Sequence, residues 1–443
     1  MTDFDLIVVG GGPGGVAAAI RGTQLGARTA ICEPDKWGGL CLNRACIPTK
    51  FFTTTGDRAA EGHVPMDEPQ LWAQKNELTG YFSLGTKSLL GNKGVEIFEE
   101  AGRLAGPGRV TVGDRVLEAT AVIVASGGEW VRPGIPGGDL PEVINTSEFF
   151  AQEVLPQRTL FMGGGPWQVE LAQFLVSAGR EAIIMEPARH ILPGEDAEIS
   201  RRLRAVINQP PLHIMNQCDV TSLSRTSGDV RVVFSSRGQE EERVVDRVVY
   251  LARRSALGGL GLDTVGLTDL TVDDRQATAV SGLFAVGEVT GNCGWSHLAT
   301  AQGLVAAENA LGGDARVNPR TVPRVAFTRP QMAAVGLTEG EAEEAGYDVV
   351  TGEAIMGVSP MAMIQGQSNG IVKIVAESRY GEVLGLHLLA PQATELIAAG
   401  ALAIQMEATL EELARTVLPH PTISESLADA AREALGRAVF QPD

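Results

Sequence analysis

Two segments of this 443-residue chain repeat one pattern, and the repeat limits the folds that the chain can adopt. In Asp5–Gly15 an apolar run enters a stretch of glycines, and Arg158–Glu170 does the same. In each case an acid ends the next apolar run 23 residues after the first glycine, Glu33 in one segment and Glu186 in the other. This order is typical of a βαβ nucleotide-binding unit. The sequence therefore predicts two related units of this kind.

The first glycine turn has the full spacing of a dinucleotide site. Gly10 allows the tight turn, Gly12 lets the backbone approach a pyrophosphate, and Gly15 lets the helix pack closely on the strand. The free N–H groups at the start of the helix face that anion. Glu33 can accept hydrogen bonds from a ribose. We therefore expect these four residues to hold a dinucleotide.

Composition excludes several other classes of protein. Lys and Arg number 36 against 54 Asp and Glu, which gives a formal charge of −18. Such a surface repels phosphate backbones, so nucleic acid is not an expected partner. We expect neither a signal peptide nor a membrane span, and a cytoplasmic location. Five cysteines argue against a structural disulfide framework. Of these, we expect Cys32, Cys218 and Cys293 to be small packed residues.

A third apolar segment, Ser281–Glu288, predicts a buried strand that ends in a glycine and an acid. A long helix is expected to follow it, from about Ser296 to Leu311.

The character of the chain changes after the proline-rich stretch Asn318–Pro323. Short strands are predicted at Val372–Val375 and Val383–Leu389. An Ala-rich helix is predicted at Gln392–Met406 and a last helix near Ser424–Leu435. This region is therefore expected to be a separate α+β unit.

Two cysteines lie five positions apart in the segment GGLCLNRACIPTK, which begins at Gly38 and ends at Lys50. Cys41 and Cys46 can close a small disulfide loop if the backbone permits it. Two alternatives are a pair of buried thiols and half of a metal site. The chain has no second cysteine pair to complete a zinc site.

This cysteine segment resembles the redox-active segment of the pyridine nucleotide–disulfide oxidoreductases, and is most similar to their dihydrolipoamide dehydrogenase branch. The segment His420-Pro421-Thr422-Ile423-Ser424-Glu425 resembles the catalytic His-Pro segment of the same family. A base with a pKa near neutral suits proton transfer with a thiol. The resemblance covers nearly the whole chain.

The resemblance implies an α/β fold with two Rossmann-like nucleotide-binding domains, one for FAD and one for NAD, and a C-terminal α+β dimerisation domain. The expected boundaries are 1–145 for the first part of the FAD-binding domain, 146–265 for the NAD-binding domain, 266–318 for the return segment of the FAD-binding domain, and 319–443 for the dimerisation domain. A homodimer is expected.

The resemblance also assigns roles to individual residues. Cys41 is the thiol that exchanges with a dithiol or disulfide substrate, and Cys46 is the thiolate that lies nearer the flavin. His420 from the partner subunit is the base for Cys41, and Glu425 orients it. FAD passes the electrons to NAD⁺. The residues expected to hold the cofactors are Gly10, Gly12, Gly15, Glu33, Gly39, Lys50, Gly102, Ser126, Gly127, Gly163, Gly165, Glu170, Glu186, Gly287, Glu288, Ser296 and His297.

The second glycine turn departs from the family pattern. Gln168 stands where a small residue normally permits close packing, so it is expected to push the turn or the helix aside. Pro166 and Trp167 precede it. Glu186 favours NAD over NADP because a carboxylate repels a 2′-phosphate, although Arg189 argues weakly the other way.

Three functions are compatible with these residues. The first is an NAD-linked dihydrolipoamide dehydrogenase, for which a lipoyl group on a carrier protein is the expected substrate. The second is a relative that acts on another thiol or disulfide with an altered or lost nicotinamide site. The third, a non-catalytic flavin-binding subunit, is disfavoured by the presence of Cys41, Cys46, His420 and Glu425. The sequence leaves the identity of the disulfide substrate open.

Overall fold

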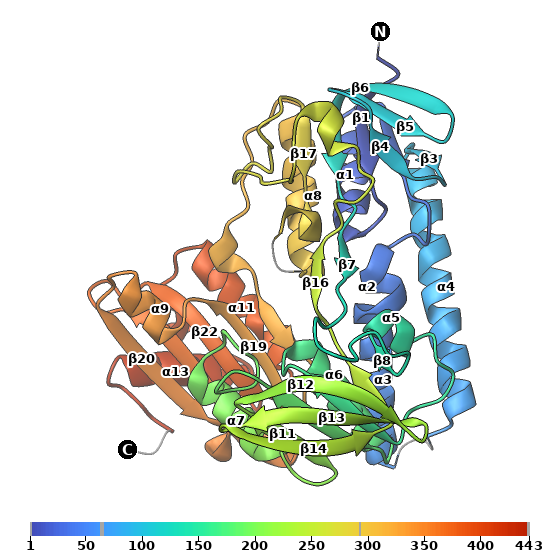
Figure 1. Cartoon of the computed structure of the whole chain (residues 1–443). Coiled ribbons are helices and arrows are strands. Elements are labelled where there is room, and N and C mark those ends of the chain that lie inside the picture. The colour runs from blue at the N-terminus through green and yellow to red at the C-terminus, as the bar shows by residue number, and fades with distance from the viewer. Residues whose placement is uncertain (1, 63–65, 292–293, 441–443) are drawn as a thin grey trace.

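Three lobes make up the part of the chain that the computed structural model describes, which comprises residues 2–62, 66–291 and 294–440. The N-terminal lobe stands above the other two in Figure 1. The middle lobe lies below it, and the C-terminal lobe lies beside the middle one. This arrangement matches the predicted α/β class with an additional α+β unit.

The first lobe is built on a mixed sheet whose parallel strands come from distant parts of the chain. Its strands lie in the order β3 (Glu96–Phe98), β2 (Thr29–Cys32), β1 (Phe4–Val9), β6 (Arg115–Val124), β5 (Arg109–Val112) and β4 (Gly102–Leu104), and β17 (Leu283–Ala285) pairs with β6. Its helices are α1 (Pro13–Gln24), α2 (Gly39–Arg44), α3 (Cys46–Ala60), α4 (Glu68–Asn92) and α8 (Ser296–Ala310). The predicted strand within 281–288 and the helix from Ser296 are thus confirmed, and α8 packs against α1 although more than 270 positions separate them.

The second lobe repeats the βαβ pattern and adds a polar meander. Its parallel sheet has the order β11 (Leu212–Asn216), β10 (Glu181–Glu186), β9 (Arg158–Met162), β15 (Arg247–Val249) and β8 (Val143–Ile144). The added antiparallel strands are β12 (Cys218–Thr226), β13 (Asp229–Ser236) and β14 (Gln239–Val245). The helices are α5 (Thr146–Phe149), α6 (Pro166–Ser177) and α7 (Ala197–Ile207), and a short ribbon of β7 (Gly128–Trp130) and β16 (Arg253–Ser255) links this lobe to the first.

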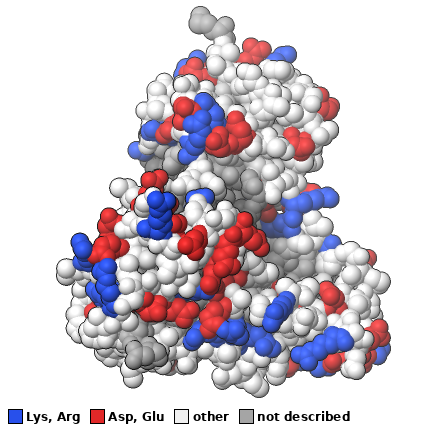
Figure 2. Space-filling view, turned by 90° about the vertical axis from the view of Figure 1, so that its left-hand side faces the viewer, with Lys and Arg blue, Asp and Glu red and all other residues white. Residues whose placement is uncertain are grey.

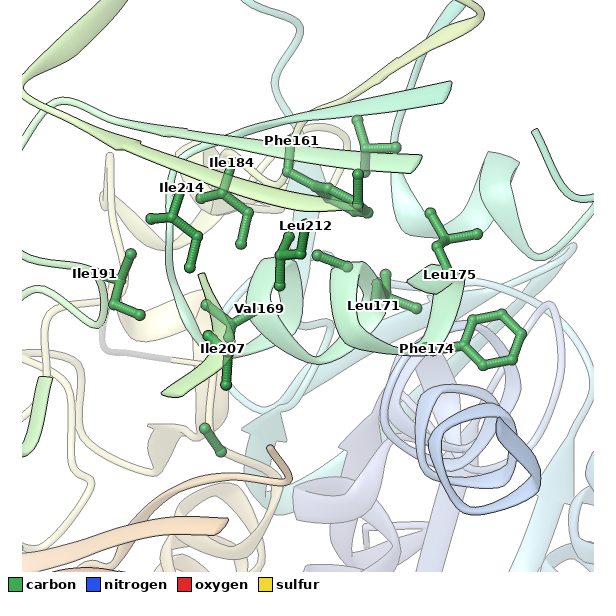
Figure 3. Packing of buried hydrophobic residues seen from close by; sticks show 14 of the residues in the cluster. Phe161, Val169, Leu171, Phe174, Leu175, Ile184, Ile191, Ile207, Leu212 and Ile214 are labelled. Atoms are coloured by element: carbon green, nitrogen blue, oxygen red, sulfur yellow. The ribbon is translucent and has the colours of Figure 1, made fainter. Parts of the chain in front are cut away.

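Apolar side chains of α6 and of the parallel strands fill the core of the second lobe (Figure 3). Phe161 and Ile184 from the strands face Val169 and Leu171 from the helix, and all four are fully buried. Removing this apolar surface from water is the main force that holds α6 on the sheet. The helix therefore begins at a fixed place, directly after the glycine turn.

The third lobe is an antiparallel sheet with helices on it. The strand order is β18 (Arg324–Ala326), β19 (Gln331–Gly336), β22 (Val383–Ala390), β21 (Ile371–Glu377) and β20 (Val349–Ile355). The helices are α9 (Glu339–Glu344), α10 (Pro360–Ile364), α11 (Ala393–Gln405), α12 (Leu410–Arg415) and α13 (Glu425–Ala434). The predicted strands and the two predicted helices of this region are confirmed to within about two residues at their ends.

Charged side chains of both signs cover the surface. Figure 2 shows acidic and basic groups interspersed over one face of the molecule. Within the described ranges, every helix is too short or too polar to traverse a lipid bilayer.

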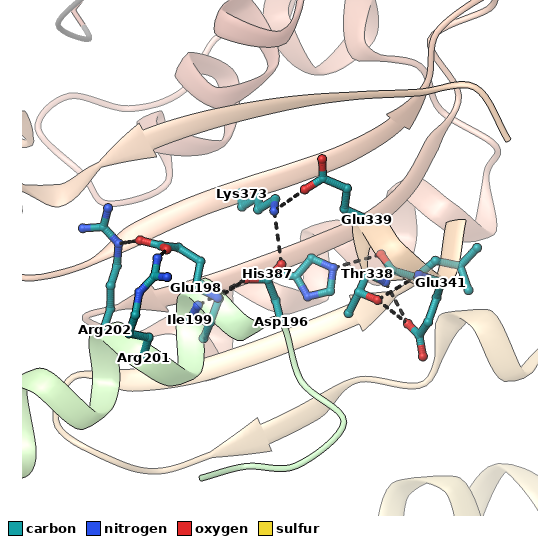
Figure 4. Close-up of polar contacts among 11 residues, drawn as sticks. Asp196, Glu198, Ile199, Arg201, Arg202, Thr338, Glu339, Glu341, Lys373 and His387 are labelled. Carbon is teal, nitrogen blue, oxygen red and sulfur yellow. Dashed lines mark hydrogen bonds and ion pairs between the residues drawn. The ribbon is translucent and has the colours of Figure 1, made fainter. Parts of the chain in front are cut away.

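A buried ion pair joins the second lobe to the third (Figure 4). The Asp196 carboxylate accepts from the Glu198 and Ile199 amides at the start of α7, and from the Lys373 ammonium of β21 at 3.2 Å. Beside it, burial lowers the pKa of His387 to about 4, so its imidazole is neutral and donates from Nε2 to the Leu337 carbonyl at 2.9 Å. The two lobes are therefore held at a defined angle.

Replacing Lys373 with Ala should lower the free energy of unfolding by about 3 kcal/mol, because it leaves the Asp196 carboxylate buried without its counter-ion. Urea denaturation followed by far-ultraviolet circular dichroism measures this. Arg201→Ala is the matched control, since Arg201 forms an exposed ion pair with Glu198 and its loss should change stability by less than about 1 kcal/mol. Equal effects of the two substitutions would contradict the role given to the buried pair.

Candidate active site

The first glycine turn forms one end of a cavity of about 670 Å³. Gly10 has a φ of +112°, and a Cβ at Gly15 would lie 1.8 Å from the Gly10 carbonyl oxygen, so both positions require glycine. The Gly11 amide donates to Glu33 at 2.8 Å, which holds the carboxylate at the cavity wall. A Cβ at Gly12 would meet nothing within 4 Å, so the space above that residue is open for a ligand.

The second glycine turn has the same hydrogen bond to the acid of the next strand as the first turn. The Gly164 amide donates to Glu186 at 2.6 Å, as Gly11 does to Glu33. The dihedral angles at the helix N-cap are also the same, with φ −69° and ψ 176° at Gly165 against −74° and −178° at Gly12. The two units are therefore structurally equivalent, as the sequence repeat predicts.

Gln168 is expected to push the turn or the helix aside; the N-cap torsion angles are close to those of the first unit, and the displacement itself stays a prediction. The clearest backbone difference is at the first glycine, where φ is +89° at Gly163 and +112° at Gly10. The side chain folds back, and its Nε2 donates to the Met162 carbonyl at 3.3 Å.

The two thiols line the same cavity. Cys41 is in α2, and Cys46 is the first residue of α3. Both line the first cavity and an adjoining one of about 870 Å³. The structure thus brings the predicted cysteine pair to the boundary between two cavities.

The surroundings favour a thiolate at Cys46. A hydrogen bond from the Cys41 thiol lowers the pKa of Cys46; burial opposes this, but the Ser296 hydroxyl at 3.4 Å and the Lys50 charge lower it further, to about 6. The same hydrogen bond, together with burial, raises the pKa of Cys41. Ser296 lies at the start of α8, whose free N–H groups also favour negative charge. The proton of the pair is therefore held on Cys41.

An ion pair from two lobes stands beside the thiols. The Lys50 ammonium of α3 contacts the Glu170 carboxylate of α6 at 2.5 Å, and the Glu170 side chain is only 1% exposed. Lys50 also lies over the Phe327 ring at 4.5 Å, and the Phe327 amide donates to Glu170 at 2.9 Å. Lys50 and Glu170, both expected to hold a cofactor, are therefore in direct contact with each other.

Glu288 makes a contact that the sequence pattern did not indicate. The Arg253 guanidinium binds its carboxylate through two contacts of 2.7 Å, donates to the Gly128 carbonyl at 2.6 Å, and stacks on the Trp130 ring at 4.4 Å. Glu288 and Arg253 line both cavities. The adjacent Arg253 and Arg254, which follow Ala252, carried no sequence signal that would pair one of them with Glu288.

Other predicted residues occupy the cavity walls as follows. Gly102 packs against the Cys32 side chain, with 3.2 Å between a Cβ at Gly102 and the Cys32 Cβ. Ser126 and Gly127 line the first cavity, and Gly127 has a φ of +74°. His297 lines the second, where burial lowers its pKa and its Nε2 contacts the Pro323 carbonyl at 2.8 Å.

The walls also contain the predicted Gly39 and Gly287, together with aromatic residues that the pattern did not single out, among them Trp295 and Phe327. Of the remaining cysteines, Cys32 lines the first cavity and Cys218 lines neither cavity. Cys32 and Cys218 are buried, as expected for packed thiols, and Cys293 lies outside the described residues.

His420 and Glu425 form a pair on the surface of the third lobe. His420 Nδ1 contacts Glu425 Oε1 at 3.0 Å, and the His420 side chain is 71% exposed. Burial acts to raise the pKa of Glu425, but the Thr422 amide and His420 outweigh it and hold that pKa below its ordinary value. Among the described residues that line the two cavities, His420 does not appear.

Comparison with known proteins defines the class. Residues 4–305 match the family model for pyridine nucleotide-disulphide oxidoreductases, and residues 322–431 match that family's dimerisation domain. The chain therefore belongs to the pyridine nucleotide-disulphide oxidoreductases. It is a flavoprotein disulfide oxidoreductase of a family that uses FAD and NAD, and its C-terminal lobe is a dimerisation domain.

Individual relatives narrow the comparison. A dihydrolipoyl dehydrogenase of Thermus scotoductus is 36% identical, with 97% of each chain covered. A dihydrolipoyl dehydrogenase of Haloferax volcanii is 33% identical, with 99% of this chain and 98% of that protein covered. The crystal structure of LpdA from Mycobacterium tuberculosis is 26% identical, has a TM-score of 0.86, and covers 96% of this chain and 98% of its own.

The first cavity fits FAD. Its open end above Gly12 suits a pyrophosphate, and Glu33 faces the same space. The cavity is also lined by Cys41 and Cys46, so a flavin held there would lie beside the dithiol and could exchange electrons with it. A Cβ at Gly102 would lie 3.2 Å from the Cys32 Cβ, so a side chain there would crowd this wall, whereas glycine would let a ligand approach the backbone.

The role of Ser296 in lowering the pKa of Cys46 can be measured by alkylation of the dithiol-reduced enzyme with iodoacetamide, located by mass spectrometry. The rate at Cys46 should rise with pH to a midpoint of about 6, since only the thiolate reacts. Ser296→Ala should move that midpoint up by about one pH unit, because one hydrogen bond to a charged sulfur is lost.

Thr300→Ala is the control for this measurement. Its hydroxyl donates to the Ser296 carbonyl at 3.0 Å and contacts no thiol, so the midpoint should stay in place. An unchanged midpoint in Ser296→Ala would show that the hydroxyl does not stabilise the thiolate.

Proposed function

We propose that this chain is an NAD-linked dihydrolipoamide dehydrogenase, in which Cys41 and Cys46 oxidise a substrate dithiol to a disulfide. The observation that carries the proposal is the unequal thiol pair. Cys46 has its pKa lowered to about 6, and Cys41 retains its proton at the cavity boundary. A dithiol with one stabilised leaving thiolate is the arrangement that disulfide exchange needs.

The exchange balances as follows. In the oxidised enzyme, a substrate thiolate attacks the sulfur of Cys41 and breaks the Cys41–Cys46 bond, and Cys46 leaves as the thiolate. The second substrate thiol loses its proton and attacks the substrate sulfur of the mixed disulfide, which releases Cys41. The substrate is oxidised by two electrons and the cysteine pair is reduced by two. The low pKa of Cys46 makes it the better leaving group.

When bound, FAD takes this electron pair from the dithiol and delivers it to NAD⁺. The residues that we propose hold the FAD are Gly10, Gly12, Gly15, Glu33, Gly39, Lys50, Gly102, Ser126, Gly127, Gly287, Glu288, Ser296 and His297. Those that we propose for NAD are Gly163, Gly165, Glu170 and Glu186. The equivalent backbones of the two glycine turns support both sets.

His420 is proposed to accept and return the substrate proton in the partner's site, oriented by Glu425. Its exposure and its place on the dimerisation domain support a role across a subunit interface. A carboxylate bound to Nδ1 fixes the imidazole so that Nε2 faces outward, as a base requires.

We further propose that the chain divides into the four predicted segments, 1–145, 146–265, 266–318 and 319–443. The boundary between the first two lies a few residues before 145, because β8 pairs with β15 of the second sheet. A lipoyl group on a carrier protein is the proposed substrate. A cytoplasmic location is also proposed, since free buried thiols such as Cys32 suit a reducing compartment.

A second candidate is a disulfide oxidoreductase for another thiol, with an altered nicotinamide site. Gln168 and Trp167 favour it, because both lie at the second cavity, at the start of α6. The two candidates differ in the electron partner and in the dithiol that they accept.

Anaerobic stopped-flow absorbance of the purified enzyme separates the two candidates. Dihydrolipoamide should reduce the enzyme within the dead time or shortly after, and NAD⁺ should then reoxidise it. NADH added to the oxidised enzyme should reduce it as well. Reduction by dihydrolipoamide with no response to NADH or NAD⁺ would favour the second candidate, and no response to dihydrolipoamide would exclude the first.

The shared site can be tested with heterodimers that carry two affinity tags. A heterodimer of one Cys41→Ser chain and one His420→Gln chain should keep about half of the wild-type activity, because one of its two sites pairs an intact Cys41 with the other chain's intact His420. The control joins a wild-type chain to a Cys41→Ser/His420→Gln chain and should be inactive. The opposite result would place His420 and Cys41 of one chain in the same site.

A further inference from the structure

The two glycine turns have similar N-cap torsion angles and the same hydrogen bond to the acid of the next strand, but they differ in what lies above the second glycine. In both units the amide of the first glycine donates to a carbonyl of the next strand along the chain, Gly10 to Cys32 of β2 at 2.8 Å and Gly163 to Met185 of β10 at 2.7 Å. The helix then opens with a proline at its first position. The equivalence makes the first unit a reference for the space that a dinucleotide needs in the second.

In the first unit that space is clear. A Cβ built on Gly12 meets nothing within 4 Å, and a side chain at Gly15 is excluded because its Cβ would lie 1.8 Å from the Gly10 carbonyl oxygen. The second glycine of such a turn is small so that a pyrophosphate can approach the backbone. The open space at Gly12 is therefore the pyrophosphate position, and Gly15 has no side chain that could extend into it.

In the second unit the same space is filled. Gln168 stands at the position that corresponds to Gly15, and its Oε1 lies 2.9 Å from a Cβ built on Gly165. Its Nε2 lies 3.1 Å from a Cβ built on Gly163 and donates to the Met162 carbonyl at 3.3 Å. Because Nε2 is engaged with that carbonyl, the amide oxygen is the atom that faces Gly165.

We infer that the side-chain amide of Gln168 occupies the pyrophosphate position of the second unit and must move aside before a dinucleotide can bind. The inference rests on the proposed use of this unit for NAD. An amide oxygen repels a phosphate oxygen, so the two do not share the position. The half-buried Gln168 lines the second cavity, where an arriving ligand meets it. It is a residue that sets nucleotide affinity, and it does not take part in the chemistry.

The second unit can bind a dinucleotide only while the Gln168 amide is displaced. Its apparent affinity for the dinucleotide therefore falls as the amide spends more time in the pyrophosphate position. Truncating the side chain removes this competition, whereas a carboxylate of the same shape adds charge repulsion. Asn in place of Gln is one methylene too short to reach Gly165 and keeps the amide. These three changes separate blocking from any other effect of residue 168.

The test is isothermal titration calorimetry of the oxidised FAD-loaded enzyme with NAD⁺, ADP-ribose and adenosine. Gln168→Ala and Gln168→Asn should lower the dissociation constants of NAD⁺ and ADP-ribose at least about fivefold. The reason is that binding no longer breaks the hydrogen bond from Gln168 to the Met162 carbonyl. Gln168→Glu should weaken both. Adenosine has no phosphate, so its affinity should not change. The flavin content per chain shows that each variant is folded.

The outcomes are distinct. Tighter binding of the two pyrophosphate ligands, or their binding to Gln168→Ala when the wild type binds neither, supports the inference. Wild-type binding of NAD⁺ that is unchanged in both shortened variants overturns the inference and leaves NAD use intact. Failure of every variant to bind NAD⁺ overturns the inference and the proposed NAD use together.

Discussion

The Glu170 carboxylate holds the three lobes together at one point. It extends from α6 of the second lobe, contacts the Lys50 ammonium of the first, and accepts from the Phe327 amide of the third. Its side chain is almost fully buried, and a buried carboxylate is stable only when it is paired and hydrogen-bonded. Lys50 lies one helical turn after Cys46 on α3, so the contact that orients the lobes also fixes the positive charge beside the thiol. The chemistry of the dithiol thus depends on how the lobes are assembled.

The parts of this structure that follow from short sequence patterns were predicted. The glycine turn at Gly10 and the acid at Glu33 depend on residues within one βαβ unit, and so does the cysteine segment. The helix α11 and the strand β22 carry enough apolar residues to be recognised. In these segments the local preference and the final packing agree.

The parts that were missed depend on contacts between distant residues. The strand β14 is mostly exposed and charged, so its sequence QEEERVV has no apolar alternation to reveal it. The Arg253 guanidinium meets Glu288 only because β16 and the turn after β17 converge. Ser296 approaches Cys46 across 250 positions of sequence. A pattern of spacing contains no information on such pairs until the fold brings them together.

The return of the chain to its first lobe also bears on the order in which the protein is built. Strand β17 and helix α8 complete the sheet and the cavity that begin at β1. All strands of the second sheet, β8 to β15, lie in the sequence between β6 and β17. A ribosome that adds 5–20 residues per second needs about 8–30 seconds to pass from the end of β6 to β17. Throughout this interval the first lobe lacks its last parallel strand, and by the end of it every strand of the second parallel sheet has been synthesised. The lobe that begins first is therefore the later of the two to receive its last parallel strand.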